Sequence, residues 1–288
     1  MYGAIEAGGT KFVCAVGDDE LKIVDRVSFP TTKPAETLMK TINFFQQYDI
    51  KALGIGSFGP IDVNESSKTY GYVTSTPKEG WKDYDFLGVL KEDLDVPMYW
   101  TTDVNAAGYG EYQAGAAKDN QSCLYLTVGT GVGGGYINHG EILQGFTHPE
   151  MGHILLTKAP GDETKGCCAF HHDHCLEGLA SGTAITTRTG KKGIELTSDD
   201  PNWEYVADYL AQACMSFTLT LSPEKIILGG GVMKQPQLLP KIKEKLLEKM
   251  NGYSTMPDIE TYIQTPGLGD NAGVTGALYL AKIKTQEA

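Results

Sequence analysis

Residues 2–16 read YGAIEAGGTKFVCAV, and this stretch decides the fold of the first half of the chain. Apolar residues flank the turn at Gly8-Gly9-Thr10 on both sides, which predicts two short strands joined as a hairpin. The pattern returns over 123–137, CLYLTVGTGVGGGYI, with its turn at Gly129-Thr130-Gly131. Two strand–Gly-Thr–strand hairpins about 120 residues apart indicate a duplicated architecture with a cleft between its halves.

Both hairpin turns have the chemistry of a phosphate site. Glycine at a hairpin tip lets backbone N–H groups approach phosphate oxygens that a Cβ atom would block. One such turn is weak evidence, but two in a duplicated context are much stronger. Residues 129–134 also fit the dinucleotide pattern G-x-G-x-x-G, yet Tyr136-Ile137 beyond them predict a strand, and that fingerprint has to open a helix.

Helices and strands alternate between and after the hairpins, which predicts an α/β protein with a mixed or parallel sheet. The expected helices cover 35–48, 87–94, 105–113, 181–189, 203–220 and 238–250, and the expected further strands cover 52–56, 98–101 and 225–228. A last helix is expected to open at Gly269–Gly273.

The charge balance excludes several classes of partner. The 288 residues include 24 Lys and Arg against 36 Asp and Glu, a net charge of −12. Such a chain repels nucleic-acid backbones and anionic membrane surfaces, and no basic patch offsets this. The first residues carry no signal-peptide pattern, and no apolar run is long enough to span a membrane, so we expect a cytoplasmic protein.

Asp103 is expected where a strand ends and a helix begins, in the sequence TDVNAAG over 102–108. One interpretation is a helix cap, which the local sequence favours. The other is a carboxylate at the carboxyl edge of a sheet, where ligands of α/β proteins bind, positioned to take a proton from a hydroxyl.

A second group of residues suggests a metal. Four of the six histidines and three of the six cysteines lie between His153 and Cys175. They are His153, Cys167, Cys168, His171, His172, His174 and Cys175. Cys and His ligands that close a short loop are what a structural zinc site requires, and a reducing compartment favours metal over disulfides. The alternative is a polar surface loop with reactive thiols, and the adjacent pairs leave the four ligands open.

Taken together, these motifs resemble the signatures of the ROK sugar kinases over essentially the whole chain. The matching stretches are Glu6–Lys11, Asp103–Gly108, Thr127–Gly135, His148–His153 and Cys175–Gly182. Within that family, residues 76–81 and 168–171 are most similar to the bacterial fructokinases.

The resemblance implies the duplicated actin-like ATPase fold, also called ribonuclease H-like, with two domains around a cleft. We expect a smaller N-terminal α/β domain over 1–115, with a C-terminal helix at about 270–288 packing back on it. A larger C-terminal α/β domain with the zinc loop is expected over 116–269. The resemblance also implies a homodimer.

The resemblance assigns roles to single residues. Asp103 is implied to be the base that activates a sugar hydroxyl, in a pocket shaped by Asn105, Glu150, His153 and Glu177. ATP with Mg²⁺ is implied to be held by Gly8, Gly9, Thr10, Lys11, Gly129, Thr130, Gly131, Thr183, Gly229, Gly230 and Gly231. Glu6 stands where many relatives carry Asp, and Thr183 where the pattern has Pro.

Structural Zn²⁺ is implied to be bound by His153, Cys168, His171 and Cys175. Three residues separate His171 from Cys175 where the family pattern usually has two. His172 and His174 are therefore alternatives for the fourth ligand.

Three functional alternatives accompany phosphorylation of D-fructose to fructose 6-phosphate. A sugar-responsive repressor of the same family is disfavoured, because the first hairpin begins by residue 3 and the net charge opposes DNA. A sugar sensor without catalysis is disfavoured by Asp103 and the two hairpins. Glucokinases, mannokinases and N-acetylmannosamine kinases share the same motifs and remain the rival substrate classes.

Overall fold

The computed structural model describes residues 1–286, and the chain divides into two compact units. Unit 1 comprises Met1–Lys118, Gly140–Pro149 and the chain from Gly267 onward; unit 2 comprises Asp119–His139 and Glu150–Pro266. Gly140–Pro149, which falls inside the second expected domain by sequence, thus groups with unit 1. No helix within 1–286 has the length and apolar character needed to cross a bilayer.

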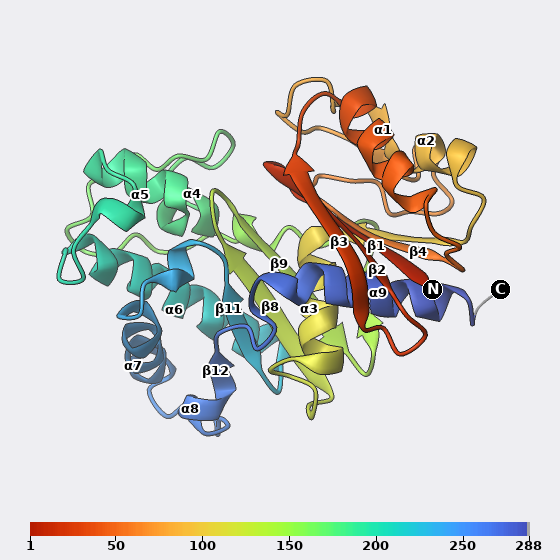
Figure 1. Cartoon of the computed structure of the whole chain (residues 1–288). Coiled ribbons are helices and arrows are strands. Elements are labelled where there is room, and N and C mark those ends of the chain that lie inside the picture. Colours follow the sequence, from red (N-terminus) through yellow and green to blue (C-terminus); the bar gives the residue numbers. More distant parts are fainter. Residues whose placement is uncertain (287–288) are drawn as a thin grey trace. The chain divides into compact units, whose positions relative to one another are not determined.

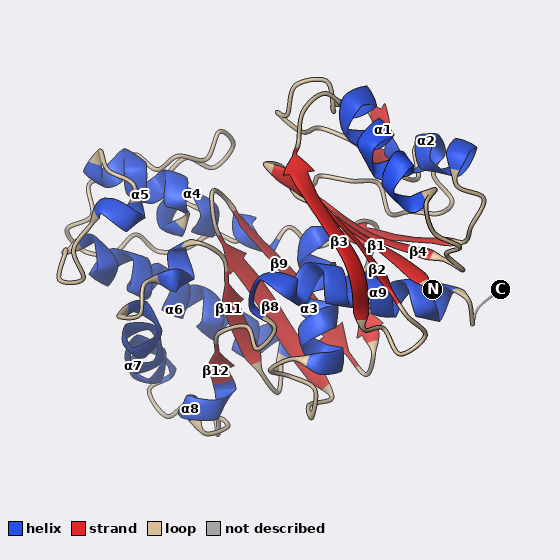
Figure 2. Ribbon diagram, viewed as in Figure 1, coloured by secondary structure: helices blue, strands red, loops and turns tan. Residues whose placement is uncertain are grey.

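Unit 1 is built on a five-stranded sheet in the order β3-β2-β1-β4-β7 (Figures 1 and 2). Its elements are β1 (Tyr2–Ala7), β2 (Lys11–Gly17), β3 (Ile23–Pro30), α1 (Pro34–Phe45), β4 (Leu53–Ser57), β5 (Tyr72–Val73), β6 (Tyr84–Asp85), α2 (Phe86–Asp93), β7 (Met98–Thr102), α3 (Asp103–Ala114), β10 (Glu141–Ile142), the 3₁₀ turn η4 (Gly269–Asn271) and α9 (Ala272–Lys284). The first three strands are antiparallel, whereas β1, β4 and β7 are parallel.

Helices cover both faces of this sheet, so the strands β1, β2, β4 and β7 are largely buried on both sides, whereas the edge strand β3 is mostly exposed. Ile5 and Phe12 join the core under α1 and α2, and the alternate residues Ala4 and Val13 pack against Leu278 of α9. Helices α3 and α9 approach so closely that a Cβ atom on Gly276 would lie 1.7 Å from the carbonyl oxygen of Ala106. Of the helix expected over 270–288, α9 accounts for Ala272–Lys284, and residues 287–288 lie outside the described residues.

Unit 2 repeats the strand pattern of unit 1. Its elements are β8 (Ser122–Val128), β9 (Val132–Asn138), η1 (Met151–His153), α4 (Leu176–Ala180), α5 (Gly182–Thr189), η2 (Gly193–Glu195), α6 (Asn202–Leu221), β11 (Ile226–Gly229), η3 (Val232–Lys234), α7 (Leu238–Met250), α8 (Ile259–Tyr262) and β12 (Ile263–Gln264). The order β9-β8-β11-β12 matches β2-β1-β4-β7, with one antiparallel hairpin followed by parallel strands. The duplication predicted from the two Gly-Thr hairpins is thus visible in the topology.

Candidate active site

The carboxyl ends of three neighbouring strands form one edge of the unit 1 sheet. The strand register pairs Ala7 with Ser57, and Ser57 with Thr102. Glu6 at the end of β1 and Asp103 directly after β7 therefore lie at the same edge. Ligands of open α/β sheets bind at edges of this kind.

Asp103 is the first residue of α3, and Thr102 is the residue that caps this helix. The Thr102 Oγ1 atom accepts a hydrogen bond from the backbone N–H of Asn105 at 3.1 Å. Asp103 Oδ1 accepts from the N–H of Val104 at 2.9 Å. The interpretation of Asp103 as the helix cap is therefore wrong, because Thr102 fills that role.

Asn105 carries a buried acceptor that no described residue satisfies. Its side chain is 3% exposed, and its Nδ2 donates to Thr101 Oγ1 at 3.0 Å. Its Oδ1 atom has no hydrogen-bond partner among residues 1–286. A buried carbonyl oxygen without a partner is costly, so this atom is suited to accept a hydrogen bond from a ligand hydroxyl.

Glu6 is held at this edge in an acidic environment. Burial, together with the negative charge of Asp103, raises the pKa of Glu6 from 4.5 to about 7, against the lowering effect of Lys11 and Arg26. Its Oε2 atom is buried without a partner among the described residues. Close packing holds the side chain there, since a Cβ atom on Gly273 would come within 2.6 Å of the carboxyl group.

The first Gly-Thr turn joins β1 to β2 next to Glu6. Gly8 donates its N–H to the carbonyl of Lys11 at 3.0 Å and accepts from the Thr31 hydroxyl at 2.6 Å. Gly9, Thr10 and Lys11 are exposed. The turn thus has a fixed base and an open tip, as a phosphate-binding hairpin requires.

The second Gly-Thr turn, in unit 2, is fastened to the start of α5. The N–H of Gly182 donates to the carbonyl of Gly129 at 2.7 Å, and the Thr183 hydroxyl donates to the carbonyl of Thr130 at 2.8 Å. The structure therefore brings Thr183 together with the turn Gly129–Gly131, although Pro is absent at 183.

The third glycine run, Gly229–Gly231, follows β11. Gly230 has a φ of +91°, and a Cβ atom there would lie 2.5 Å from the carbonyl oxygen of Val128, so only glycine fits. Gly229 pairs with Thr127 in the register of β11 and β8. This pairing brings the glycine run to the end of β8, directly before the turn of the second hairpin.

Two of the sugar-pocket candidates in unit 2 are positioned by short elements. Glu177 lies in the first turn of α4, and its Oε2 accepts from the N–H of Val132 at 3.0 Å. Glu150 is exposed and directly precedes η1, whose last residue is His153. The remaining pocket candidate, Asn105, and the candidate base Asp103 belong to unit 1.

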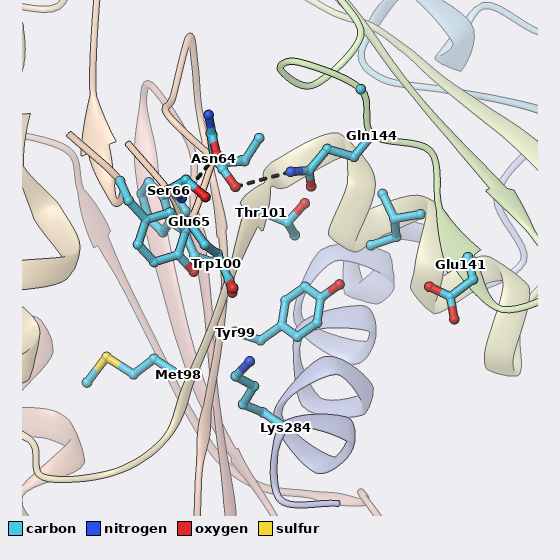
Figure 3. A pocket seen from close by; sticks show the side chains of 14 residues that line it. Asn64, Glu65, Ser66, Met98, Tyr99, Trp100, Thr101, Glu141, Gln144 and Lys284 are labelled. Atoms are coloured by element: carbon cyan, nitrogen blue, oxygen red, sulfur yellow. Dashed lines mark hydrogen bonds between the residues drawn. The ribbon is translucent and has the colours of Figure 1, made fainter. Parts of the chain in front are cut away.

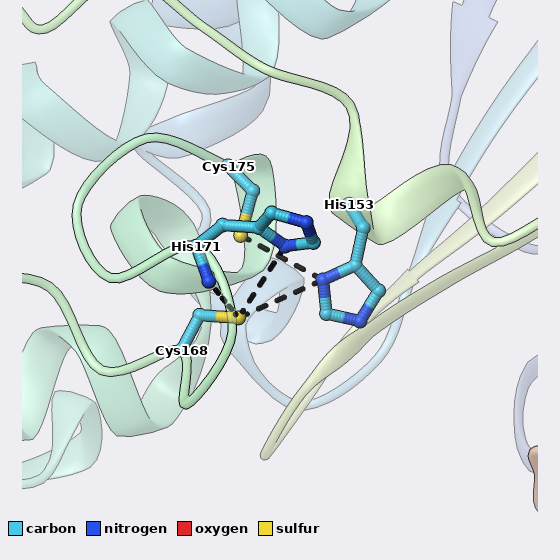
Figure 4. Close-up of side chains that lie close together, drawn as sticks. All are labelled: His153, Cys168, His171 and Cys175. Atoms are coloured by element: carbon cyan, nitrogen blue, oxygen red, sulfur yellow. Dashed lines mark hydrogen bonds between the residues drawn. The ribbon is translucent and has the colours of Figure 1, made fainter.

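His153, Cys168, His171 and Cys175 converge on one point (Figure 4). Their ligand atoms all lie within 4.8 Å of one another. The Cys168 sulfur is 3.7 Å from Nδ1 of both His153 and His171, and the Cys175 sulfur is 3.7 Å from Nδ1 of His153. Zinc bonds of about 2.0–2.3 Å in a tetrahedron give edges of about 3.5 Å, so this cluster fits Zn²⁺.

The remaining candidates do not join this cluster. His172 and His174 are exposed, and Cys167 instead contacts the Ser181 hydroxyl at 3.5 Å. Backbone N–H groups of His171 and Gly178 donate to the sulfurs of Cys168 and Cys175 at 3.3 and 3.4 Å. Such outer contacts orient thiolate ligands.

A separate hollow of about 510 Å³ lies beside β7 in unit 1 (Figure 3). Tyr99, Thr101 and Lys284 line it, and Gln144 closes one side by donating to the carbonyl of Val63 at 3.1 Å. None of the predicted site residues lines this hollow.

Comparison with known proteins identifies the class to which this fold and these residues belong. The model of the ROK family matches residues 2–284, and the chain belongs to this family. A fructokinase of Pediococcus pentosaceus is 51% identical over 288 residues and covers 100% of both chains. A fructokinase of Lactococcus lactis subsp. cremoris is 49% identical, covering 97% of this chain and 96% of that one.

The solved structures agree with the family. A ROK hexokinase from Thermus thermophilus superposes with a TM-score of 0.82 at 27% identity, covering 100% of this chain and 99% of that one. The fold is therefore the actin-like ATPase fold expected from the sequence, with the two-domain architecture of a kinase.

Proposed function

We propose that this chain is an ATP-dependent kinase that converts D-fructose to fructose 6-phosphate. The observation that carries this proposal is the similarity to fructokinases at 49% and 51% identity over the full length of the chain. The buried acceptor of Asn105 and the carboxylate at the edge of the unit 1 sheet support it, because a sugar kinase needs to bind hydroxyl groups and to remove a proton.

Asp103 is the general base in this proposal. Its carboxylate takes the proton of the acceptor hydroxyl as the sugar oxygen attacks the γ-phosphorus. The bond from phosphorus to the bridging oxygen of ADP breaks as the new P–O bond forms. Asn105 Oδ1, Glu150, His153 and Glu177 bind the remaining sugar hydroxyls, and this fixes which oxygen faces the phosphorus.

The glycine turns bind ATP in this proposal, through the residues Gly8, Gly9, Thr10, Lys11, Gly129, Thr130, Gly131, Thr183, Gly229, Gly230 and Gly231. The assignment of these residues to ATP is supported by the exposed tip of the first turn and by the hydrogen-bonded backbone of the second turn. Glu6, with its unsatisfied Oε2 atom, fits a role toward Mg²⁺. Mg²⁺ supplies neutralisation of phosphate charge when bound.

The proposal also includes one structural Zn²⁺ bound by His153, Cys168, His171 and Cys175. This ion holds the segment that carries His153 and Glu177. Its thiolate ligands stay reduced in the cytoplasm, where we expect the enzyme to act. We also expect a homodimer, as the family resemblance implies, with the sugar and ATP as its small-molecule partners and neither nucleic acid nor membrane as a partner.

Incubation of the purified chain with fructose, ATP and Mg²⁺ tests the activity. We expect equal amounts of ADP and a sugar phosphate that phosphoglucose isomerase converts to glucose 6-phosphate, which identifies the 6-phosphate. Sugar binding without ADP release would instead support the sensor alternative. ADP release only with glucose, mannose or N-acetylmannosamine would support one of the rival kinases.

A further inference from the structure

Glu111 is a fully buried carboxylate in the last turn of α3 for which the proposed chemistry has no use. Its Oε2 atom accepts hydrogen bonds from the backbone N–H groups of Ala116 at 2.7 Å and Gly267 at 2.9 Å. Its Oε1 atom accepts from the N–H of Leu268 at 2.8 Å. One side chain therefore binds two segments that are about 150 residues apart in the chain, and hydrogen bonds to a carboxylate are among the strong ones.

The two segments lie where the chain first leaves unit 1 and where it last re-enters it. The first stretch of unit 1 ends at Lys118, two residues after Ala116, and the chain returns to this unit at Gly267. Glu111 thus links the segment through which the chain leaves unit 1 to the segment through which it returns.

Two glycines make room for this carboxylate. A Cβ atom on Gly115 would lie 2.1 Å from Glu111 Oε2, and one on Gly267 would lie 2.9 Å from the backbone nitrogen of Ala116. A residue larger than glycine at position 115 or 267 would therefore disturb the contacts of the Glu111 carboxylate.

Both segments lead directly to the carboxylates of the candidate site. Helix α3, which ends beside Glu111, begins at Asp103. From Leu268 the chain runs through η4 to Gly273, which packs against the Glu6 carboxyl group. Helices α3 and α9 are in direct backbone contact, since a Cβ atom on Gly110 would lie 2.3 Å from the carbonyl oxygen of Ala272.

We propose that Glu111 is a positioning residue that fixes the segment from Gly267 to Gly273 against α3, and thereby fixes Glu6 relative to Asp103. It touches neither substrate nor the reacting atoms. The catalytic part of this inference rests on the proposed kinase activity. Small misplacement of reacting groups is costly to the chemical step, so loss of this contact lowers kcat more than it weakens sugar binding.

Glu111→Gln tests the contact with little change in shape. Glutamine keeps one carbonyl oxygen, but its NH₂ group faces backbone N–H donors that need an acceptor. Asp18→Asn is the matched control, because Asp18 also accepts from two backbone N–H groups, those of Glu20 and Lys22, in the turn between β2 and β3. Glu111→Asp, which keeps the charge but shortens the side chain, replaces Glu111→Gln if that variant does not fold.

Amide hydrogen exchange and steady-state kinetics are measured on the full zinc-loaded chain, below the unfolding temperature of each variant. We expect exchange at Ala116, Gly267 and Leu268 to accelerate by about tenfold or more in Glu111→Gln. We expect kcat to fall by about tenfold with the KM for fructose nearly unchanged, and the control to behave as the parent.

Unchanged exchange rates at the three amides in Glu111→Gln would overturn the proposal that Glu111 fixes these two segments. Faster exchange with an unchanged kcat would reduce Glu111 to a structural residue and overturn its positioning role. If the parent chain does not phosphorylate fructose, the proposed function fails, whereas the exchange experiment still decides whether Glu111 fixes the two segments.

Discussion

At the scale of single residues, the environment of each carboxylate decides its role. Thr102 caps α3, so Asp103 is not required for that purpose although it is the adjacent residue. Glu111 has the same chemistry in the same helix and serves the backbone instead. Three side chains of similar type, Glu6, Asp103 and Glu111, thus have different hydrogen-bond partners because their neighbours differ.

Asp103→Asn should abolish phosphorylation while it leaves binding of ATP and fructose nearly intact. The substitution removes the proton acceptor and hardly changes the shape, and loss of general-base assistance costs about 10²–10⁴ in rate. Single-turnover kinetics together with calorimetric titration of fructose measure the two effects. The exposed Asp93 at the end of α2 provides the control Asp93→Asn. A kcat close to that of the parent would show that Asp103 is not the base.

Glu6→Gln should stabilise the protein at alkaline pH. The pKa of Glu6 is about 7 in the folded protein against 4.5 for an ordinary glutamate, so the folded state binds this proton more tightly than the unfolded state does. The contribution of this proton to the free energy of unfolding is present at low pH and is lost as pH rises through 7. Because glutamine does not titrate, the gain from the substitution should be about 2 kcal/mol larger at pH 8 than at pH 5.

Urea unfolding at the two pH values, without Mg²⁺ or ATP, measures this difference. Glu79→Gln, at an exposed position, is the control. An equal effect of Glu6→Gln at both pH values would show that Glu6 titrates like an ordinary glutamate.

At the scale of elements, local signals predicted the hairpins, β7 and α3, whereas weak or interrupted patterns were missed. Strand β3 lies at the edge of the sheet with mostly exposed residues, so it lacks a regular apolar alternation. The sequence predicts α5 but misses the short helix α4 directly before it. The two helices are separate because Ser181 ends α4 and its hydroxyl, which accepts from the N–H of Ala184, caps α5. Glu111 resembles any surface glutamate in a helix, and only contacts distant in sequence reveal its role.

The proposed zinc site belongs to this scale, because a bound ion would order the whole segment from His153 to Cys175. We expect one Zn²⁺ per chain, and Cys168→Ser should lose it. Since the ligand His153 and the neighbouring Glu177 are proposed to bind sugar, the KM for fructose should rise by about tenfold or more while the KM for ATP changes less.

Cys167→Ser is a close control, because Cys167 is adjacent in sequence but lies outside the four-residue cluster. Elemental analysis and kinetics before and after chelation measure both effects. Protein purified without chelator that contains no zinc would contradict the metal site, and loss of zinc from Cys167→Ser would change the ligand set.

At the scale of the whole molecule, the repeated glycine hairpins predicted two related sheets, and both occur with matching strand order. The membership of Gly140–Pro149 in unit 1 was not predictable in this way. This segment follows β9 directly in the chain, so its sequence neighbours suggest unit 2. Its assignment depends on contacts such as that of Gln144 with Val63, which no local pattern encodes.

Substrate choice concerns the complete chain, since the residues proposed to bind the sugar, Asn105, Glu150, His153 and Glu177, are spread widely over its sequence. We expect fructose to give the highest kcat/KM, mannose to be second and glucose to be poor. Polar side chains that lose a hydroxyl partner discriminate far more strongly than an apolar pocket of the same size. The buried Oδ1 atom of Asn105 is such a group, because no described residue satisfies it.

Fructose and glucose differ at carbons 1 and 2, so a pocket arranged for the ketose leaves a polar group unpaired or crowded when it binds the aldose. One unpaired buried group is worth about tenfold or more in kcat/KM. Initial rates at subsaturating fructose, mannose and glucose, with ATP and Mg²⁺ in excess, give the ratios directly. Asn105→Ala should then compress the ratio of fructose to glucose, because it removes the acceptor rather than the base. Faster turnover of glucose than of fructose by the parent would contradict the choice of fructose and leave the kinase class intact, since the base and the glycine turns are independent of which hexose fits.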